Sequence, residues 1–313
     1  MISSVSSNLP KGHPIVKKSH IHLLSLSSIG LLLSASCFPI SAASVPGPVH
    51  GLWVWKSPAI LGAPRGAVLL RDFCRSEGIN EVYVSVSAKS ETSEEDELAE
   101  LIALMHGANI RVEALFSSTD ADEPGKHRDS LLDRAQNIVR FNNKHRSASF
   151  DGIHLDVEPW QRQENKGAGN LQFLPGLVDA FRAVVAIAKP AGLTVNADIA
   201  VKLLKGDPSQ REMLLSSVPR FTLMMYELTK PQDGTGVEQK AEQVVKTSQK
   251  DLDMAYEGLN ERNLGKMVIA LRTADYGDLL PRILRALEEA NQLNSHYLGW
   301  ARHSYNDTLP AAQ

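Results

Sequence analysis

Cysteine is scarce in this sequence, since 313 residues contain only Cys37 and Cys74. A disulfide framework is excluded, because Cys37 lies in the leader described below and Cys74 has no partner. Cys74 follows Phe73 in a segment of helical pattern, which favours a small buried hydrophobe over a nucleophile. The fold must therefore depend on an apolar core, and 43% hydrophobic residues suffice for one large domain.

The sequence also lacks an excess of charge of either sign. Its 33 basic and 36 acidic residues give a formal net charge of −3, which indicates neither a nucleic-acid nor an anionic-membrane partner. No Gly-x-Gly-x-x-Gly motif follows the first expected strand, which argues against a dinucleotide site. We therefore expect no cofactor.

The apolar run at residues 23–33 is too short to span a bilayer. Lys17 and Lys18 precede this run and small residues ending in Ala43 follow it, which is the order of a cleaved export signal. We expect a signal peptide at 1–43 and a secreted or periplasmic mature protein without a transmembrane segment. Lipid attachment at Cys37 is the alternative, disfavoured because Ser34 stands where a lipobox usually has an aliphatic residue.

The most informative stretch of the chain is residues 150–160, FDGIHLDVEPW. Its two-residue alternation predicts a β-strand with one wholly apolar face and one face that carries three ionisable side chains. Pro159 removes a ladder donor and ends the strand, so its carboxyl-terminal end is at Glu158. The ionisable face, with His154, Asp156 and Glu158, would be costly to bury in an apolar core and so predicts a polar site.

Strand patterns and helical patterns alternate along the rest of the chain. Eight such strands predict a closed (β/α)8 barrel, whose chemistry takes place at the carboxyl-terminal ends of the strands. Ten residues remain after His303, so the last outer helix is expected to be missing or vestigial. We expect a linker at 44–50, the barrel at 51–305 and a tail at 306–313. The expected strands are 51–56, 81–87, 111–116, the stretch at 151–158, 194–200, 221–227, 267–273 and 297–303.

Three motifs resemble those of the family-18 glycoside hydrolases, the chitinases and endo-β-N-acetylglucosaminidases. Residues 151–158 resemble the family's fourth-strand pattern Asp-Gly-x-Asp-x-Asp-x-Glu, with His154 in place of the middle aspartate. The Met-Met-Tyr-Glu run at 224–227 resembles its sixth-strand Met-x-Tyr-Asp, with Glu227 in place of the aspartate, and Trp300 resembles its eighth-strand tryptophan. The resemblance implies a TIM barrel that hydrolyses glycans containing N-acetylhexosamine.

Breaking a glycosidic bond requires a carboxylic acid of raised pKa, and Glu158 is the best candidate. Asp156 lies on the same face at about 7 Å along the strand, where its negative charge would raise that pKa. The resemblance implies that Glu158 acts as acid and then as base, that Asp156 stabilises a cyclic oxazolinium, and that Tyr226 hydrogen-bonds the acetamido oxygen. The expected partner is therefore a glycan or oligosaccharide.

The remaining candidates have two interpretations each. Glu113, Asn196 and Asp198 could line the mouth or form an inner polar layer. Trp300 could stack on a sugar ring or fill the core, with Trp53, Trp55 and Trp160 as weaker stacking candidates. Arg272 could neutralise carboxylates or grip an anionic sugar. We expect His154 to pair with Asp156 and to be charged. The expected substrate-binding residues are His154, Trp300, Glu113, Asn196, Asp198, Glu227 and Arg272.

Two other functions fit the same residues. One is a carbohydrate-binding barrel without turnover, because His154 changes the charge pattern of the motif. The other is a metal-dependent hydrolase, since barrel mouths with nitrogen and oxygen ligands hold metals. No His-x-His pair occurs on the first strand, and we assign no metal ligand. The candidate ligands for this alternative are His154, Asp156, Glu158, Glu113, Asp198 and His303.

Overall fold

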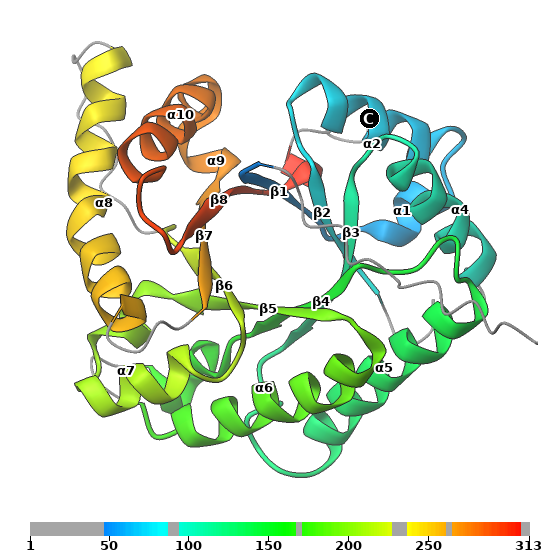
Figure 1. Ribbon diagram of the computed structural model, residues 1–313, viewed down its shortest axis with the longest axis horizontal. Helices are drawn as coiled ribbons and strands as arrows, with labels where there is room; N and C mark the ends of the chain where they lie inside the picture. The colour runs from blue at the N-terminus through cyan, green and yellow to red at the C-terminus, as the bar shows by residue number, and fades with distance from the viewer. Residues whose placement is uncertain (1–46, 87–93, 167–170, 227–236, 261–264, 308–313) are drawn as a thin grey trace, which may run out of the picture. The chain divides into compact units, whose positions relative to one another are not determined.

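The chain forms a closed parallel (β/α)8 barrel, as the alternating strands and helices predict (Figure 1). The computed structural model describes residues 47–86, 94–166, 171–226, 237–260 and 265–307. Every strand pairs with its neighbours in chain order, and β8 closes the barrel against β1. The strands are β1 (Val49–Val54), β2 (Glu81–Ser85), β3 (Arg111–Ser118), β4 (Gly152–Val157), β5 (Thr194–Ala200), β6 (Arg220–Met224), β7 (Lys266–Arg272) and β8 (Tyr297–His303).

Helices surround the strands on the outside of the barrel (Figure 1). No helix among the described residues is long and apolar enough to cross a membrane. The helices are α1 (Ser57–Leu61), α2 (Gly66–Ser76), α4 (Glu95–His106), α5 (Lys126–Lys144), α6 (Leu174–Ala188), α7 (Pro208–Leu215), α8 (Val237–Asn260), α9 (Thr273–Tyr276) and α10 (Leu280–Asn291).

The main core lies between the outward faces of the strands and the inward faces of these helices. In α6 the buried residues recur every three or four positions, at Leu174, Leu177, Val178, Phe181 and Val184, which is the spacing of one helical face. Ile153, Leu155 and Val157 of β4 belong to the same core. The apolar face of the 150–160 stretch therefore points outward, and its ionisable face points into the barrel.

Several boundaries differ from expectation by a few residues. β1 begins at Val49, so the barrel starts inside the range 44–50 assigned to the linker. β6 ends at Met224 and not at residue 227: Met225 still donates to Ala270 of β7 at 3.0 Å, and the chain turns at Tyr226. Within the described part of the chain, only the 3-10 turn Tyr305–Asp307 follows β8, in agreement with a vestigial last helix.

Closure of the barrel depends on a glycine in β8. Gly299 pairs with Val49 and has φ +147°, a conformation that other residues rarely adopt. A Cβ there would collide with the backbone of Val49, so only glycine allows β8 to approach β1 this closely. The register of β7 and β8 also shifts at Met267 and Val268. These irregularities set which β8 residues face the interior.

Candidate active site

The floor of the barrel is a buried cluster of charged side chains. Arg220 of β6 donates hydrogen bonds to both carboxylate oxygens of Glu81, one of them at 3.0 Å, and lies 3.4 Å from Glu113. Arg111 also donates to Glu81, at 3.2 Å. Both glutamates are fully buried, so each carboxylate depends on these guanidinium groups for its counter-charge.

His154 lies above this floor, in the middle of the barrel. Its Nδ1 is 3.2 Å from Glu113 Oε2 and its Nε2 is 2.7 Å from Asp198 Oδ1. The ring packs on Tyr83 with a centroid separation of 3.8 Å. Burial lowers the pKa of His154, but the charges and hydrogen bonds of Asp198 and Glu113 outweigh it and raise the pKa to about 9. The two carboxylate contacts therefore favour the protonated imidazole.

The contact with His154 lowers the pKa of Glu113. Burial raises its pKa, whereas the charge of Arg220 and the hydrogen bond to His154 lower it, to about 2. Thr194 donates to Glu113 as well, at 3.4 Å. Asn196 lies beside His154 at 3.0 Å and accepts a hydrogen bond from Thr222. Glu113 and Asn196 thus belong to a buried inner layer.

Asp198 connects that inner layer to the mouth. One carboxylate oxygen contacts His154, and the other accepts a hydrogen bond from Trp53 Nε1 at 3.3 Å. Its charge raises the pKa of three groups at the carboxyl-terminal ends of the strands, Asp156, Glu158 and Tyr226. Asp198 therefore lies within electrostatic reach of every residue to which we assign a catalytic role.

Glu158 follows β4 and is only half buried, so a substrate could reach it. Burial and then the charge of Asp198 raise its pKa to about 7, against the charge of Lys202 and hydrogen bonds from Trp160 and Gln161. A carboxyl group with this pKa can both donate and accept a proton near neutral pH. Lys202 belongs to the 3-10 segment Val201–Lys205 and lies 5.6 Å from the centre of the Trp160 ring.

Asp156 and Tyr226 each present a buried polar atom to this mouth. Asp156 is 8% exposed, and its Oδ1 has no hydrogen-bond partner among the described residues. Burial, followed by the charges of Asp198 and Glu158, raises its pKa well above the ordinary value. The Tyr226 hydroxyl likewise lacks a partner within the described ranges, and burial and Asp198 raise its pKa.

The opposite wall of the mouth comes from β1, β7 and β8. Trp55 Nε1 donates to His303 Nε2 at 2.8 Å, and the His303 ring lies 5.4 Å from the ring of Tyr226. Arg272 lies 5.7 Å from the Tyr226 ring and forms two hydrogen bonds to Asp275, at 2.9 and 2.8 Å. Arg272 therefore reaches the site, with its charge already paired.

Some sequence predictions about these residues are wrong. Trp300 faces outward, where it stacks on His50 at 4.1 Å and donates to Glu288 at 3.1 Å, so it cannot be the sugar platform. Glu113 and Asn196 do not line the mouth, because both are fully buried in the inner layer. His154 pairs with Asp198 and Glu113 and not with Asp156, and the expected charge on its ring stays a prediction. Glu227 lies outside the described residues.

Two residues that build the site, Arg220 and Glu81 of the floor, are not among the candidates from the sequence. His303 and Trp55, which the sequence indicated only as a metal ligand and a stacking residue, form one wall. A signal for His303 exists: counting in steps of two from Gly299 places Ala301 and His303 on the inward face and Trp300 on the outward face. The Glu81–Arg220 pair carries no such signal, because its members are 139 residues apart.

The geometry disfavours the metal-dependent alternative. No group of three or more potential metal ligands occurs in the part of the chain that the structure describes. A histidine ligand must also be neutral with one free nitrogen, whereas both ring nitrogens of His154 contact protein carboxylates.

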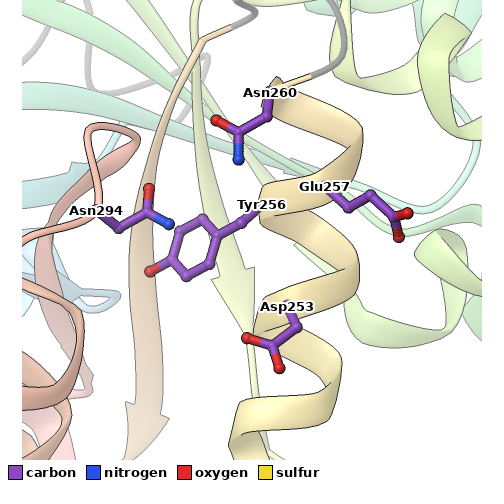
Figure 2. Close-up of a pocket in the computed structure, with 5 residues that line it drawn as sticks. All are labelled: Asp253, Tyr256, Glu257, Asn260 and Asn294. Atoms are coloured by element: carbon purple, nitrogen blue, oxygen red, sulfur yellow. The ribbon is translucent and has the colours of Figure 1, made fainter.

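A separate groove lies at the other end of the barrel. It has a volume of about 610 Å³ and lies where α8 and the loop before β8 meet. Figure 2 shows Tyr256 of α8 pointing toward Asn294, with Asn260 above it. Tyr256 Oη donates to Asn291 at 3.0 Å. Because Asn260 precedes β7 and Asn294 precedes β8, this groove is remote from Glu158.

Fold and site together define a TIM-barrel protein whose fourth strand carries a pair of carboxyl groups at the carboxyl-terminal mouth. No protein-family model matches the sequence, and no curated protein sequence is significantly similar to it.

Solved structures share the fold at low sequence identity. Cellulose synthase subunit Z from Clostridioides difficile is 13% identical with a TM-score of 0.52, over 82% of this chain and 91% of that one. A GH18 chitinase from Pseudoalteromonas aurantia is 10% identical with a TM-score of 0.50, over 83% and 94%. The PgaB glycoside hydrolase domain from Bordetella bronchiseptica is 12% identical with a TM-score of 0.47, over 82% and 94%. At such identities the comparisons establish the barrel fold alone.

Proposed function

We propose that this chain is an exported glycoside hydrolase that cleaves glycans containing N-acetylhexosamine, with Glu158 as acid and then base. One observation carries the proposal. Beside the half-buried Glu158 lie two buried polar atoms without partners in the described chain, Asp156 Oδ1 and Tyr226 Oη. One can accept and the other can donate a hydrogen bond, which matches the N–H and C=O of an acetamido group.

In the first step the sugar's own acetamido oxygen attacks the anomeric carbon. Glu158 gives its proton to the glycosidic oxygen as the bond from that oxygen to the anomeric carbon breaks. Tyr226 orients the acetamido oxygen, and Asp156 Oδ1 accepts the acetamido N–H. The product of this step is a cyclic oxazolinium with the leaving glycan released as an alcohol.

In the second step the Glu158 carboxylate takes a proton from water as the water oxygen attacks the anomeric carbon. The ring opens and the acetamido group is restored, so one water is consumed and the configuration is retained. An enzyme nucleophile is not required. Asp198 is poorly suited to that role, because His154 and Trp53 engage its two oxygens. β7 carries no carboxylate.

This mechanism predicts that hydrolysis depends on the 2-acetamido group. Oligosaccharides of N-acetylhexosamine should be cleaved, whereas matched oligosaccharides with a 2-hydroxyl group should not. A thiazoline analogue of the cyclic intermediate should inhibit strongly, because transition-state-like ligands bind far more tightly than substrates. Product analysis of the paired oligosaccharides is the measurement, and efficient cleavage of the 2-hydroxyl series would rule the mechanism out. Saturable binding without any product would instead support the non-catalytic carbohydrate-binding function.

The pKa of Glu158 predicts the pH dependence. The acid must be protonated to act, and its pKa is raised to about 7, so kcat/KM should fall as the pH rises through about 7. Lys202 lowers this pKa, so Lys202→Met should move the fall to higher pH. The measurement is the pH–rate profile of both proteins on a soluble oligosaccharide. An unchanged rate up to pH 9 would contradict the assignment of Glu158 as the acid.

Export is the second part of the proposal and is supported by the leader at 1–43. Fractionation of cells that express the full chain, with the amino terminus of the product sequenced, should find the mature protein outside the cytoplasm and beginning after Ala43. Retention in the cytoplasm with an intact leader would contradict this part alone.

A further inference from the structure

A continuous line of charged side chains runs from the floor of the barrel to its mouth. Arg220 contacts Glu113, Glu113 contacts His154 Nδ1, and His154 Nε2 contacts Asp198. His154, Glu113 and Asp198 are at most 1% exposed, so water does not screen these contacts. Asp198 is the last member of the line before Asp156 and Glu158.

We propose that His154 is a positioning residue: held as an imidazolium between Glu113 and Asp198, it fixes the Asp198 carboxylate, whose negative charge acts on Asp156 and Glu158. The inference rests on the proposed function for its role in the reaction. The electrostatic coupling itself can be tested without any substrate.

The balance of charge inside the barrel supports this arrangement. Inside the barrel the ion-paired cations are Arg111, Arg220 and His154, and the ion-paired anions are Glu81, Glu113 and Asp198. Arg111 is shared, because it also lies 3.8 Å from Asp151. Asp156 and Glu158 form no ion pair within 4 Å in the described part of the chain. Neither carboxyl group has a counter-charge within that distance, which agrees with the raised pKa of each.

The competing arrangement is a neutral imidazole. Asn196 Nδ2 lies 3.0 Å from His154 Nδ1 and could donate to it, which would leave the proton on Nε2 alone. A half-turn of the Asn196 amide would instead place its oxygen there, and the Thr222 hydroxyl can serve either orientation because it both donates and accepts. The neutral form would leave Glu113 Oε2 facing a nitrogen lone pair at 3.2 Å. The close contacts to two carboxylates therefore favour the cation.

The groups that act on the titrations of His154 and Glu158 come from several elements of the barrel. Around His154 they are Glu113 from β3, Asp198 from β5, the phenol of Tyr83 from β2, and Asp156 from β4 itself. Around Glu158 they are Asp198, Asp156, Lys202, Gln161 and Trp160. Two acidic residues, Asp198 and Asp156, belong to both sets.

The first test is the ¹⁵N spectrum of the histidine rings in the wild-type protein at pH 7.5. Both nitrogens of His154 should be protonated, and they should stay so until the pH approaches about 9. The ring is assigned by its loss in His154→Asn or, if that variant does not fold, by its contacts with the Tyr83 ring. One deprotonated nitrogen at pH 7.5 would overturn the proposal.

The second test follows the Glu158 carboxyl by ¹³C titration in His154→Asn, Asp198→Asn and the double variant. Asp198→Asn removes a charge that raises the pKa of Glu158, so the Glu158 midpoint should fall by about one pH unit or more. His154→Asn removes the 2.7 Å contact that fixes the Asp198 carboxylate, so it should also move the Glu158 midpoint. The double variant should match Asp198→Asn, because the two changes act through the same charge. His154→Lys keeps a cation and should keep the midpoint near that of the wild type.

The matched control is His106→Asn, which breaks a histidine–aspartate pair of 3.0 Å outside the barrel interior and should leave Glu158 unaffected. An unchanged midpoint in His154→Asn, or additive shifts in the double variant, would refute the coupling. If the protein hydrolyses glycans, the fall of the pH–rate profile should move with the same midpoints. If it does not, the ¹⁵N and ¹³C results still decide the inference, so the two proposals fail separately.

Discussion

Replacing Glu158 with glutamine should reduce turnover of an N-acetylhexosamine oligosaccharide by ~10²–10⁴-fold, the usual contribution of a general acid. Glutamine keeps the shape of the side chain but cannot deliver a proton to the leaving oxygen. Binding of the oligosaccharide should be retained, because Asp156 Oδ1 and Tyr226 Oη, the two atoms proposed to bind the acetamido group, are unaffected. The measurements are kcat on the soluble substrate and the dissociation constant from calorimetry.

Glu289→Gln is the matched control for this variant. Glu289 lies exposed on the outer helix α10, so the same chemical change there should alter neither kcat nor binding. Hydrolysis by Glu158→Gln at the wild-type rate would show that another group supplies the proton. Loss of both binding and turnover would indicate that Glu158 holds the substrate and does not act as the acid.

The second large effect is expected in stability, at the floor of the barrel. Arg220→Met should reduce the free energy of unfolding at pH 7 by about 3–5 kcal/mol, because it leaves Glu81 and Glu113 buried with too little positive charge. Denaturant unfolding followed by tryptophan fluorescence measures this loss. The exposed Arg285→Met on α10 is the matched control and should change stability little.

The pH dependence of this loss has a defined sign. In the wild type, Glu113 has a pKa lowered to about 2, so its contribution to stability is present above the unfolded value of about 4.3 and is lost as the pH falls toward 2. In Arg220→Met the Glu113 carboxylate loses the charge that lowers its pKa and can take up a proton, so the deficit should be smaller at pH 4 than at pH 7. Arg220→Met with Glu81→Gln should recover part of the stability. An equal deficit at both pH values would contradict the electrostatic explanation.

The strand order and the inward face of β4 could be predicted from local pattern. The alternation in residues 150–160 is visible without any partner, because side chains of a strand alternate between its two faces. Eight repeated strand–helix units then leave few architectures other than the closed barrel. The pKa of Glu158 is raised, in the direction expected, with burial and then the charge of Asp198 as the largest causes.

The position of Trp300 shows where local pattern is insufficient. The strand Tyr297–His303 carries one basic side chain on each face, Arg302 on one and His303 on the other, so its composition does not reveal which residues point inward. Which residues of β8 point inward is decided by Gly299, which lies against Val49, and by the register shift between β7 and β8. The result is that His303, and not Trp300, faces the mouth.

By itself the sequence determined the barrel and the polar face of β4, on which the proposed acid Glu158 follows, because each depends on periodicity within a short segment. Only the tertiary structure decided the partner of His154, since Asp198 lies 44 residues away on the neighbouring strand. It also decided that Glu113 and Asn196 are buried below the mouth, since depth in a barrel depends on strand register. Electrostatic coupling depends on distance in space. Arg220, Glu113, His154 and Asp198 come into one line only when the strands assemble into the barrel.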